Sequence, residues 1–522
     1  MTMMLLLFIT LALGGVDGNI RAGDSPNSQW VSMGPEGKLV YKSTARGDRI
    51  MDFSYAGYGG GGVALPSVGV KRVVKPSGGD DTAIIQEAID AVSAMPLEQG
   101  FRGAVLLAPG IYNTSATITI STSGVVLRGS GAGGETRSTI KMSGEPHLAL
   151  AIRVSVGGEG SGPAHSREER ARTTIRDEYV PSGAMQLHVA DASGFAVGDA
   201  IAILKPVTMA WVKFMQMHDL VRDGRSQTWL AVDRMLTTER RIVAISGNTF
   251  ALDVPLSDSF DAGHLNPPGT AVVKIQPPPR ITQAGVEHLH IESPQQPISH
   301  SQPHFTAVRL SGEDCWIRDL VLDETMNSVG VNGRRITVER VTVNRKALHQ
   351  GASRPAEFAP NGTQVLIDRC EVNAENVWFI ATGSGYAGPI VILNCVFRGD
   401  GRAESHQRWS TGMLYDNVLA PNGGIDFRNR GSMGSGHGWS MGWGVAWNCV
   451  AKDFIIQDPP GVHNWMIGCI GESLPMPRPF GSGPNLPEGI KDSHGAHVIP
   501  RSLYLAQLAE RLGPRAVRNI GY

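Results

Sequence analysis

The chain consists mostly of short apolar runs separated by turn residues, and helical spacing of apolar residues occurs mainly near its two ends. Residues 80–94, DDTAIIQEAIDAVSA, predict one amphipathic helix because its isoleucines and Val92 fall near one face. Residues 103–134 contain alternating or apolar runs broken by Gly, Pro, Asn and Ser, which is typical of strands and turns. Residues 501–514, RSLYLAQLAERLGP, predict a second short helix that ends at Gly513.

A short strand motif recurs through the second half of the chain, for example as ERVTV at 339–343 and NCVFR at 394–398. The motif repeats at steps of 20 to 32 residues with no helical pattern between copies, which predicts a solenoid of β-strands. Equivalent residues would then stack about 4.8 Å apart, so Cys and Asn in the motif are expected to be core and ladder residues. The apolar third positions, predicted to align, are Leu289, Leu320, Val341, Cys370, Val396, Val418, Val450 and Ile470.

The early helix, the segment GAVLLAPGIYNTSATITI followed by SGVVLRGSG, and the repeated strands resemble the right-handed parallel β-helix proteins of the pectate-lyase-like superfamily. The resemblance covers roughly residues 75–150 and 283–472. It implies an all-β, right-handed parallel β-helix solenoid whose N-terminal edge is covered by the early helix. Residues 151–280 lack the motif and alternate around Gly-Asp and Gly-Asn turns, which predicts a β-rich insertion.

The first eighteen residues carry an apolar run that ends in small residues and is too short for a membrane span. Although a basic n-region is missing, this pattern predicts a secretory signal peptide and a secreted or periplasmic protein. The predicted organisation is a signal peptide at 1–18, an N-terminal extension at 19–74, a capping helix with the first turns of the coil at 75–150, a β-rich insertion at 151–280, the main coil with the active cleft at 281–475, and a C-terminal tail with a short helix at 476–522.

Composition changes this picture little. The formal net charge of −1, from 47 basic and 48 acidic residues, argues against nucleic acid as a partner. Glycine is frequent, at 64 of 522 residues, which agrees with a body rich in turns. The five cysteines are too few and odd in number for a disulfide framework, so we expect them in the core.

Aromatic, histidine and arginine residues concentrate in the segments 404–412, 423–443 and 457–465. Solenoid cores are built from aliphatic residues, Cys and Asn, so these side chains are expected to point outward and form a site. Counting back 12 or 13 residues from the aligned apolar positions reaches Glu357, His406, His437 and Asp458, which predicts a column on one face. The predicted catalytic residues are His437, His406, Arg408, Arg430 and Asp458, and the predicted substrate-binding residues are Arg428, Trp409, Trp439, Trp443, Glu357, His349 and His463.

This mixture suits cleavage of a uronate polysaccharide by β-elimination, which needs a cation for the carboxylate, a base for the C5 proton and an acid for the leaving oxygen. Arginines provide bidentate carboxylate binding, and histidines titrate near neutral pH. Tryptophan faces stack on sugar rings. The arginine density favours a route without a cofactor, although Ca²⁺ is used by some β-helix lyases and stays open as the carboxylate neutraliser.

Two alternatives stay open at this stage. Hydrolysis would need two carboxyl groups, for which Glu357, Asp416, Asp426 and Asp458 are available. Gly436-His437-Gly438 resembles the Gly-His-Gly of polygalacturonases, but their Asn-x-Asp and Asp-Asp pairs are missing ahead of it. A non-catalytic β-helix that only binds glycans would need no proton-transfer pair. In each case the expected partner is a polysaccharide, with no nucleic acid, no membrane after signal removal and a monomeric chain.

Overall fold

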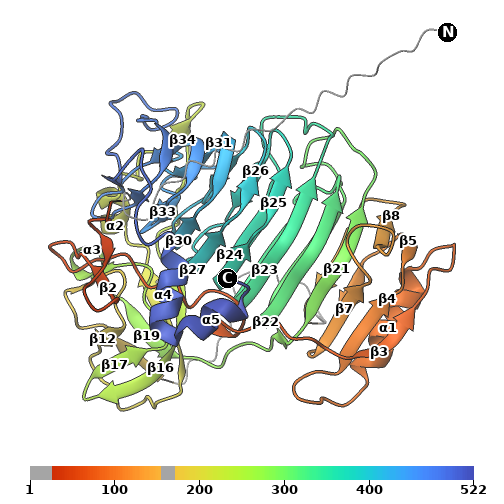
Figure 1. Cartoon of the computed structure of the whole chain (residues 1–522). Helices are drawn as coiled ribbons and strands as arrows, with labels where there is room; N and C mark the ends of the chain where they lie inside the picture. Colours follow the sequence, from red (N-terminus) through yellow and green to blue (C-terminus); the bar gives the residue numbers. More distant parts are fainter. Residues whose placement is uncertain (1–25, 155–170) are drawn as a thin grey trace, which may run out of the picture.

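The computed structural model describes residues 26–154 and 171–522, and its body is a coil of parallel strands (Figure 1). One sheet of 25 strands winds round the coil. Each turn pairs in parallel register with the next, as in the row Val286, Ile317 and Val338. The all-β parallel β-helix expected from the sequence is confirmed, and its right hand is the one that parallel crossover connections adopt.

Strands of the coil fall into an early and a late group, separated by the insertion. The early strands are β3 (Val70–Val74), β4 (Gly103–Leu107), β5 (Gly110–Thr114), β6 (Ile118–Ile120), β7 (Val125–Gly129), β8 (Ser138–Met142) and β9 (Leu148–Ile152). The next are β20 (Ile281–Thr282), β21 (Gly285–Glu292), β22 (Thr306–Asp323), β23 (Val329–Asn344), β24 (Ala356–Asp368), β25 (Glu371–Asn373), β26 (Trp378–Ala381), β27 (Ala387–Leu393) and β28 (Val396–Phe397). The last are β29 (Arg402–Glu404), β30 (Ser410–Asp416), β31 (Leu419–Phe427), β32 (Met441–Gly442), β33 (Val445–Trp447), β34 (Val450–Ile456), β35 (Trp465–Ile467), β36 (Ile470–Ser473) and β37 (Ile490–Asp492).

The coil has three faces, which we name sheets 1, 2 and 3 in the order in which the chain passes through them. Buried aliphatic side chains from all three sheets fill its interior. Helix α1 (Thr82–Ser93) covers the first turn with the buried residues Ile85, Ile89 and Val92, which confirms the capping helix. The inward rows begin with Leu127, Val286 and Ile317 in sheet 1, Ile140, Ile291 and Leu322 in sheet 2, and Leu150, Val308 and Val329 in sheet 3.

The repeat alignment slips by one residue in the later turns. The strand register aligns Cys395 with Cys370, and Cys449 with Cys469, so these cysteines occupy the inward row in place of Val396, Val450 and Ile470. All five cysteines are buried, as predicted, whereas Ile470 is 36% exposed. Because side chains alternate between the two faces of a strand, a slip of one residue reverses inside and outside.

The residue just before this inward row has a left-handed backbone conformation and forms the bend between sheet 1 and sheet 2. Asn394 and Asn448 occupy it with φ of 49° and 51°, and Asn417 has φ of 54°. Asparagine tolerates this region better than most residues, because its short polar side chain can bond locally. Asn417, rather than Asp416, therefore corresponds to Asn394 and Asn448.

Residues 171–274 contain the predicted β-rich insertion, which the fold confirms as an antiparallel structure beside the coil (Figure 1). Its principal sheet has the order β10-β19-β13-β16-β17-β12. Its strands are β10 (Ala171–Thr174), β11 (Tyr179–Val180), β12 (Gln186–His188), β13 (Ala200–Pro206), β14 (Val221–Arg222), β15 (Arg225–Ser226), β16 (Met235–Ser246), β17 (Thr249–Leu252), β18 (Phe260–Asp261) and β19 (Ala271–Lys274), with helices α2 (Met209–Phe214) and α3 (Ala262–Leu265).

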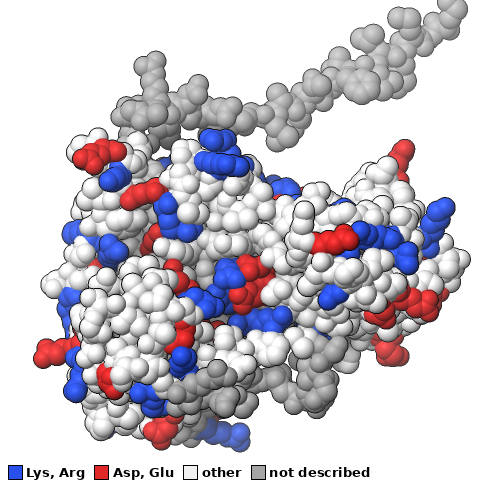
Figure 2. All heavy atoms as spheres, turned by 90° about the horizontal axis from the view of Figure 1, so that it is seen from below, with Lys and Arg blue, Asp and Glu red and all other residues white. Residues whose placement is uncertain are grey.

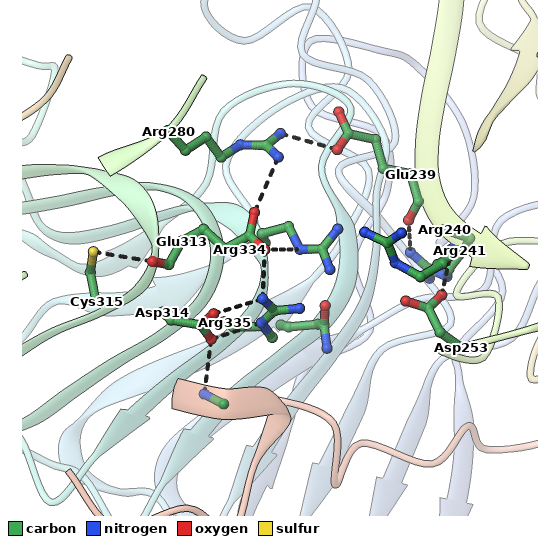
Figure 3. Close-up of polar contacts among 12 residues, drawn as sticks. Glu239, Arg240, Arg241, Asp253, Arg280, Glu313, Asp314, Cys315, Arg334 and Arg335 are labelled. Carbon is green, nitrogen blue, oxygen red and sulfur yellow. Dashed lines mark hydrogen bonds and ion pairs between the residues drawn. The ribbon is translucent and has the colours of Figure 1, made fainter. Parts of the chain in front are cut away.

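A network of ion pairs joins the insertion to the coil (Figure 3). Arg280 pairs with Glu239 of β16 at 3.0 Å and with Glu313 of β22 at 3.4 Å, while Arg335 of β23 pairs with Glu313 at 2.5 Å and with Asp314 at 2.6 Å. Viewed from below, acidic and basic side chains mix near the middle of the molecule and form no large patch of one sign (Figure 2). This network fixes the insertion to the coil.

The N-terminal extension and the C-terminal helices cover the outer side of sheet 1 (Figure 1). Helix α4 (Leu503–Leu512) buries Leu508 there, and Phe53 N–H donates to Gln507 Oε1 at 2.9 Å. The short C-terminal helix predicted from the sequence is thus confirmed. The remaining elements are β1 (Val31–Met33), β2 (Leu39–Tyr41), the 3-10 turn η1 (Tyr58–Gly60) and α5 (Pro514–Asn519).

In the two described ranges, every helix is too short or too polar to cross a membrane. The predicted signal peptide at 1–18 lies outside the described residues, so it stays a prediction.

Candidate functional site

Two loops at the end of sheet 3 bring His406 and His437 together. One loop follows β29 and the other follows β31, and they pair through Arg408 N–H to His437 O at 3.2 Å and Trp409 N–H to Trp439 O at 2.9 Å. The rings of His406 and His437 consequently lie with their centroids 5.0 Å apart. The sequence prediction that these two imidazoles share one wall therefore has direct geometric support.

Glu404, the last residue of β29, orients His406. The Glu404 side chain is only 2% exposed, and its Oε1 lies 2.5 Å from His406 Nδ1. Burial alone would raise the pKa of Glu404, but the Arg430 guanidinium and the His406 hydrogen bond lower it to about 2. An ionised carboxylate has no proton to donate, so His406 Nδ1 carries the proton.

Arg430 lies against both groups of this pair, contacting Glu404 Oε1 and His406 Nδ1. Since His406 Nδ1 is itself a donor, the Arg430 hydrogen bond goes to the Glu404 carboxylate. In the neutral imidazole of His406, Nε2 is then the unprotonated nitrogen, and no hydrogen bond to it occurs within the described ranges. The His406 side chain is 18% exposed, so a base is available at the surface.

Trp378, the first residue of β26, borders the imidazole. It is half-buried, and its ring centroid lies 5.1 Å from that of His406. The Arg430 and Arg354 guanidinium carbons lie 5.1 Å and 5.2 Å from the Trp378 centroid. The sequence prediction omitted Trp378, Glu404 and Arg354. Trp378 could have been found from its place between Val377 and Phe379, whose side chains are buried, because the residue between two inward residues points outward.

Arg408 carries a positive charge that no described carboxylate neutralises. Its guanidinium donates instead to the Ser435 carbonyl at 2.8 Å and to Ser435 Oγ at 2.6 Å. Burial and the nearby Arg234 lower its pKa, which is the expected response of an uncompensated cation. Arg428 differs, since its Nη1 lies 3.8 Å from Asp426 and its side chain is 13% exposed.

The expected outward position of three tryptophans is wrong. Trp409, Trp439 and Trp443 are each 2% exposed. Trp439 donates its indole N–H to Met215 O at 2.9 Å, and Trp229 of the insertion donates to Trp439 O at 3.0 Å. These rings seal the insertion against the coil, because an indole buries a large apolar area while its N–H finds a carbonyl.

Glu357 and His349 do not line the His406 site as a column. Glu357 is fully buried and pairs with Arg345 at 3.2 Å, and His349 Nε2 accepts the His300 backbone N–H at 3.0 Å. Counting back 12 or 13 residues from the aligned apolar positions did not reach equivalent places, because the turns of the coil differ in length. β24 runs unbroken past Glu357, whereas β29 ends before His406.

Asp458 and His463 pair with each other, with Asp458 Oδ2 at 2.7 Å from His463 Nδ1. The Asn464 backbone N–H donates to the second carboxylate oxygen at 2.7 Å. Burial raises the pKa of Asp458, and the Asp458 hydrogen bond raises that of His463. Neither residue contacts His406 or His437 within the described part of the chain, so the predicted placement of Asp458 in the catalytic group lacks structural support.

The glycines that flank His437 serve protein packing. Gly438 has φ of 55°, and a Cβ there would collide with the Trp229 ring of the insertion. At Gly436, with φ of 86°, a Cβ would lie 2.9 Å from Gln227 Cβ and 3.0 Å from Thr228 O of the insertion. The loop can therefore lie flat beneath the insertion.

Across residues 26–154 and 171–522, no three His, Cys, Asp or Glu side chains are grouped so as to hold a metal ion. The positive charge at this site comes from guanidinium groups, and the available base is an imidazole.

His437 predicts a specific pH dependence of stability. Burial, Arg430, His406 and Arg408 lower its pKa to about 3. The unfolded chain, with an ordinary histidine pKa near 6.5, binds a proton between about pH 6.5 and 3 that the folded chain excludes, so stability falls as pH drops through this window. His437→Gln should flatten the decline by up to about 1.4 kcal/mol per pH unit, measured by urea unfolding from pH 7.5 to 5.5.

The exposed His494→Gln serves as a control and should leave the wild-type slope unchanged. An unaltered slope in His437→Gln would show that His437 titrates normally in the folded chain.

Comparisons with known proteins find similar solved structures at low identity. No family model and no curated protein matches it. Among solved structures, the Gp54 tailspike of Acinetobacter baumannii bacteriophage AP22, in complex with a capsular saccharide, is 12% identical over 76% of this chain, with a TM-score of 0.38. The gp49 tailspike of Pseudomonas phage LKA1 is 13% identical over 75% of this chain, with a TM-score of 0.40.

The alignments span 61% and 64% of these two tailspike chains, respectively. The A-module of the Azotobacter vinelandii mannuronan C-5 epimerase AlgE4 is 10% identical over 78% of this chain and 96% of its own, with a TM-score of 0.29. At these values the similarities say nothing about activity. The parallel β-helix follows from the strand pairing of the chain itself.

Proposed function

We propose that the chain cleaves an acidic, uronate-containing polysaccharide by β-elimination at the surface formed by His406, Arg408 and Trp378. One observation supports this most strongly: the buried, ionised Glu404 holds the proton of His406 on Nδ1, which leaves Nε2 as a base at the surface. A carboxylate that fixes a histidine tautomer is the usual arrangement of an oriented general base.

In the proposed reaction, His406 Nε2 removes the C5 proton of a uronate residue. The electrons left at C5 form the C4=C5 double bond as the C4–O4 bond breaks. The imidazolium then returns its proton to O4, so protons balance without a second acid. Arg408 neutralises the uronate carboxylate and so acidifies the C5 proton. His437, with its pKa lowered to about 3, is neutral at pH 7 and serves as a polar neighbour.

Burial of the acid pair argues against hydrolysis at this site. Glu404 and Asp426 are partners in neighbouring strands, but their side chains are 2% and 0% exposed. Arg402 also contacts Asp426 through two guanidinium nitrogens. A glycosidase acid and base must reach the scissile bond from opposite sides, and carboxyl groups already bound to arginines beneath the surface do not.

A protein that only binds glycans would need neither an ionised carboxylate hydrogen-bonded to a histidine nor a basic nitrogen without a hydrogen-bond partner. Trp378 and Arg408 alone would be sufficient for adhesion. The buried Glu404, costly to ionise without its partners, favours a catalytic use of His406.

The direct test incubates the full chain with polygalacturonate, alginate and hyaluronate. We expect at least one to give products with the ultraviolet absorbance of unsaturated uronate ends. Chelator should leave the rate unchanged, because Arg408 supplies the positive charge. Saturated reducing ends would instead indicate hydrolysis, and binding without cleavage would indicate an adhesive protein.

A further inference from the structure

An open pocket lies along the coil from the candidate active site. It has a volume of 540 Å³ and opens where the turn before β9 faces the loop before β22. None of its residues belongs to the His406 group. Its polar lining includes His147, His300, His304 and Arg309.

Arg309 in this pocket has no ion-pair partner in the described ranges, and the one carboxylate that acts on its charge is the buried Glu357. Its Nη1 donates to the carbonyls of Asn327 at 2.7 Å and Val308 at 3.3 Å, and within the described ranges no carboxylate pairs with it. The side chain lies flat on sheet 3 over Gly330, its partner in the next strand, where a Cβ would come within 2.6 Å of Arg309 Cδ. The fold thus makes room for this guanidinium without pairing it with an acid.

Arg402 provides an internal comparison on the same sheet. It lies over its strand partner Gly424 in the same way, since a Cβ on Gly424 would collide with the guanidinium. Yet Arg402 is bound by Asp426 and by Asp453, the latter at 2.6 Å. Arg402 and Arg309 thus lie on the sheet in the same way, but only Arg402 is paired with acidic residues. At Arg309 an anionic group of a ligand can take the place of those acids.

The histidines of the pocket offer unused hydrogen-bonding atoms. His147 donates Nδ1–H to the Glu145 carbonyl at 2.8 Å, so its Nε2 is an acceptor, and that atom is buried without a described partner. His300 Nδ1 is likewise buried, and the one partner recorded for the His300 ring is the backbone of Ser353. An acceptor nitrogen matches a ligand that has hydroxyl groups as well as a negative charge, which an acidic sugar provides and a simple carboxylate does not.

The pocket and the His406 site share the outer side of sheet 3. Arg309 belongs to β22, and four strand steps, through β23, β24 and β26, lead to β29 and Glu404. At about 4.8 Å per step this is about 19 Å along the coil axis. Gly330 and Ala359 are in register with Arg309, so two positions of the row between the sites carry small residues.

We propose that the pocket around Arg309 is a second acidic-sugar subsite, so that a uronate chain lies along the coil axis on sheet 3 with one carboxylate at Arg408 and another at Arg309. This inference rests on the proposed function and deepens it. It requires the substrate to be an oligosaccharide of several units, because no monosaccharide can bridge the two arginines.

The test measures binding, so that it does not depend on cleavage. Length-defined oligomers of galacturonate, mannuronate and glucuronate are titrated calorimetrically into the His406→Ala chain, with and without Arg309→Ala. We expect affinity to rise once the oligomer is long enough to span four turns of the coil. Arg309→Ala should lower the affinity for long oligomers by about 10-fold or more and leave that for disaccharides unchanged, because one charge-assisted contact is lost.

Arg515→Ala, at an exposed arginine of α5, is the control and should bind every length as the parent does. Thermal unfolding of each variant shows that the chain remains folded. Equal loss at all lengths, no loss at any length, or no binding of any oligomer would overturn the proposal. Length-dependent binding by the His406→Ala chain, together with no unsaturated products from the wild type, would uphold the subsite and contradict the β-elimination instead.

Discussion

His406→Ala is expected to lower kcat on the cleaved polysaccharide by about 10²- to 10⁴-fold, the usual contribution of a positioned general base. His406 Nε2 is the base in the proposed reaction, and the neutral His437, whose centroid is 5.0 Å away, lacks a carboxylate to orient it. KM should change little, because Arg408 and Trp378 retain the substrate. The measurement is initial rate against substrate concentration.

Glu404→Gln tests the orientation of that base while preserving side-chain shape. Without the carboxylate, the tautomer with Nδ1–H is no longer enforced, so kcat should fall by about 10²-fold or more. The change also leaves Arg430 without its buried partner, so thermal unfolding must accompany the kinetics. His494→Ala, at an exposed imidazole, should match wild type. Normal turnover by both His406→Ala and Glu404→Gln would remove this pair from the mechanism.

Leu508→Ala is expected to destabilise the folded chain by about 2 to 5 kcal/mol. Leu508 is fully buried where α4 meets the outer side of sheet 1, in one cluster with Leu414 and Trp447. Truncation leaves a cavity between the helix and the coil, because the paired strands cannot move inward to fill it. Urea unfolding measures the loss.

Leu512→Ala is the matched control, since Leu512 lies in the same helix and is 47% exposed. Its effect should stay within about 0.5 kcal/mol. A similar loss at both positions would mean that burial against sheet 1 does not set the contribution of Leu508, since Ala is as good a helix former as Leu.

The sequence carried enough information to predict the coil. A strand motif with an apolar row, recurring without helices, leaves few alternatives to a solenoid, and α1 and α4 showed the spacing of amphipathic helices. The register was harder, because motifs such as Asn-Cys-Val present apolar residues at two successive positions. The sequence pattern alone predicts Val396 in the inward row, whereas the strand pairing places Cys395 there.

The site was only partly predictable because turn lengths decide which side chains meet. His406, Arg408, Arg430 and His437 come together, since their two loops pair through backbone hydrogen bonds. Asp458 follows a different strand end and meets His463 instead. No local pattern encodes that difference.

The predicted outward position of the tryptophans was wrong for a different reason. An indole rich in apolar area serves a protein interface as well as a sugar, and the partners of Trp409 and Trp439 come from an insertion far away in the sequence. Trp378 and Glu404 were missed because each occupies an ordinary strand position, and only the neighbouring turns of the coil show what surrounds it.

The most direct measurement is a crystal structure of the His406→Ala chain soaked with an oligomer of whichever uronate the wild type cleaves or binds. The account predicts a sugar ring beside Trp378 with its carboxylate at Arg408, and the oligomer continuing along sheet 3 toward Arg309. An oligomer bound to another face of the coil, with Trp378 and Arg408 left bare, would contradict it.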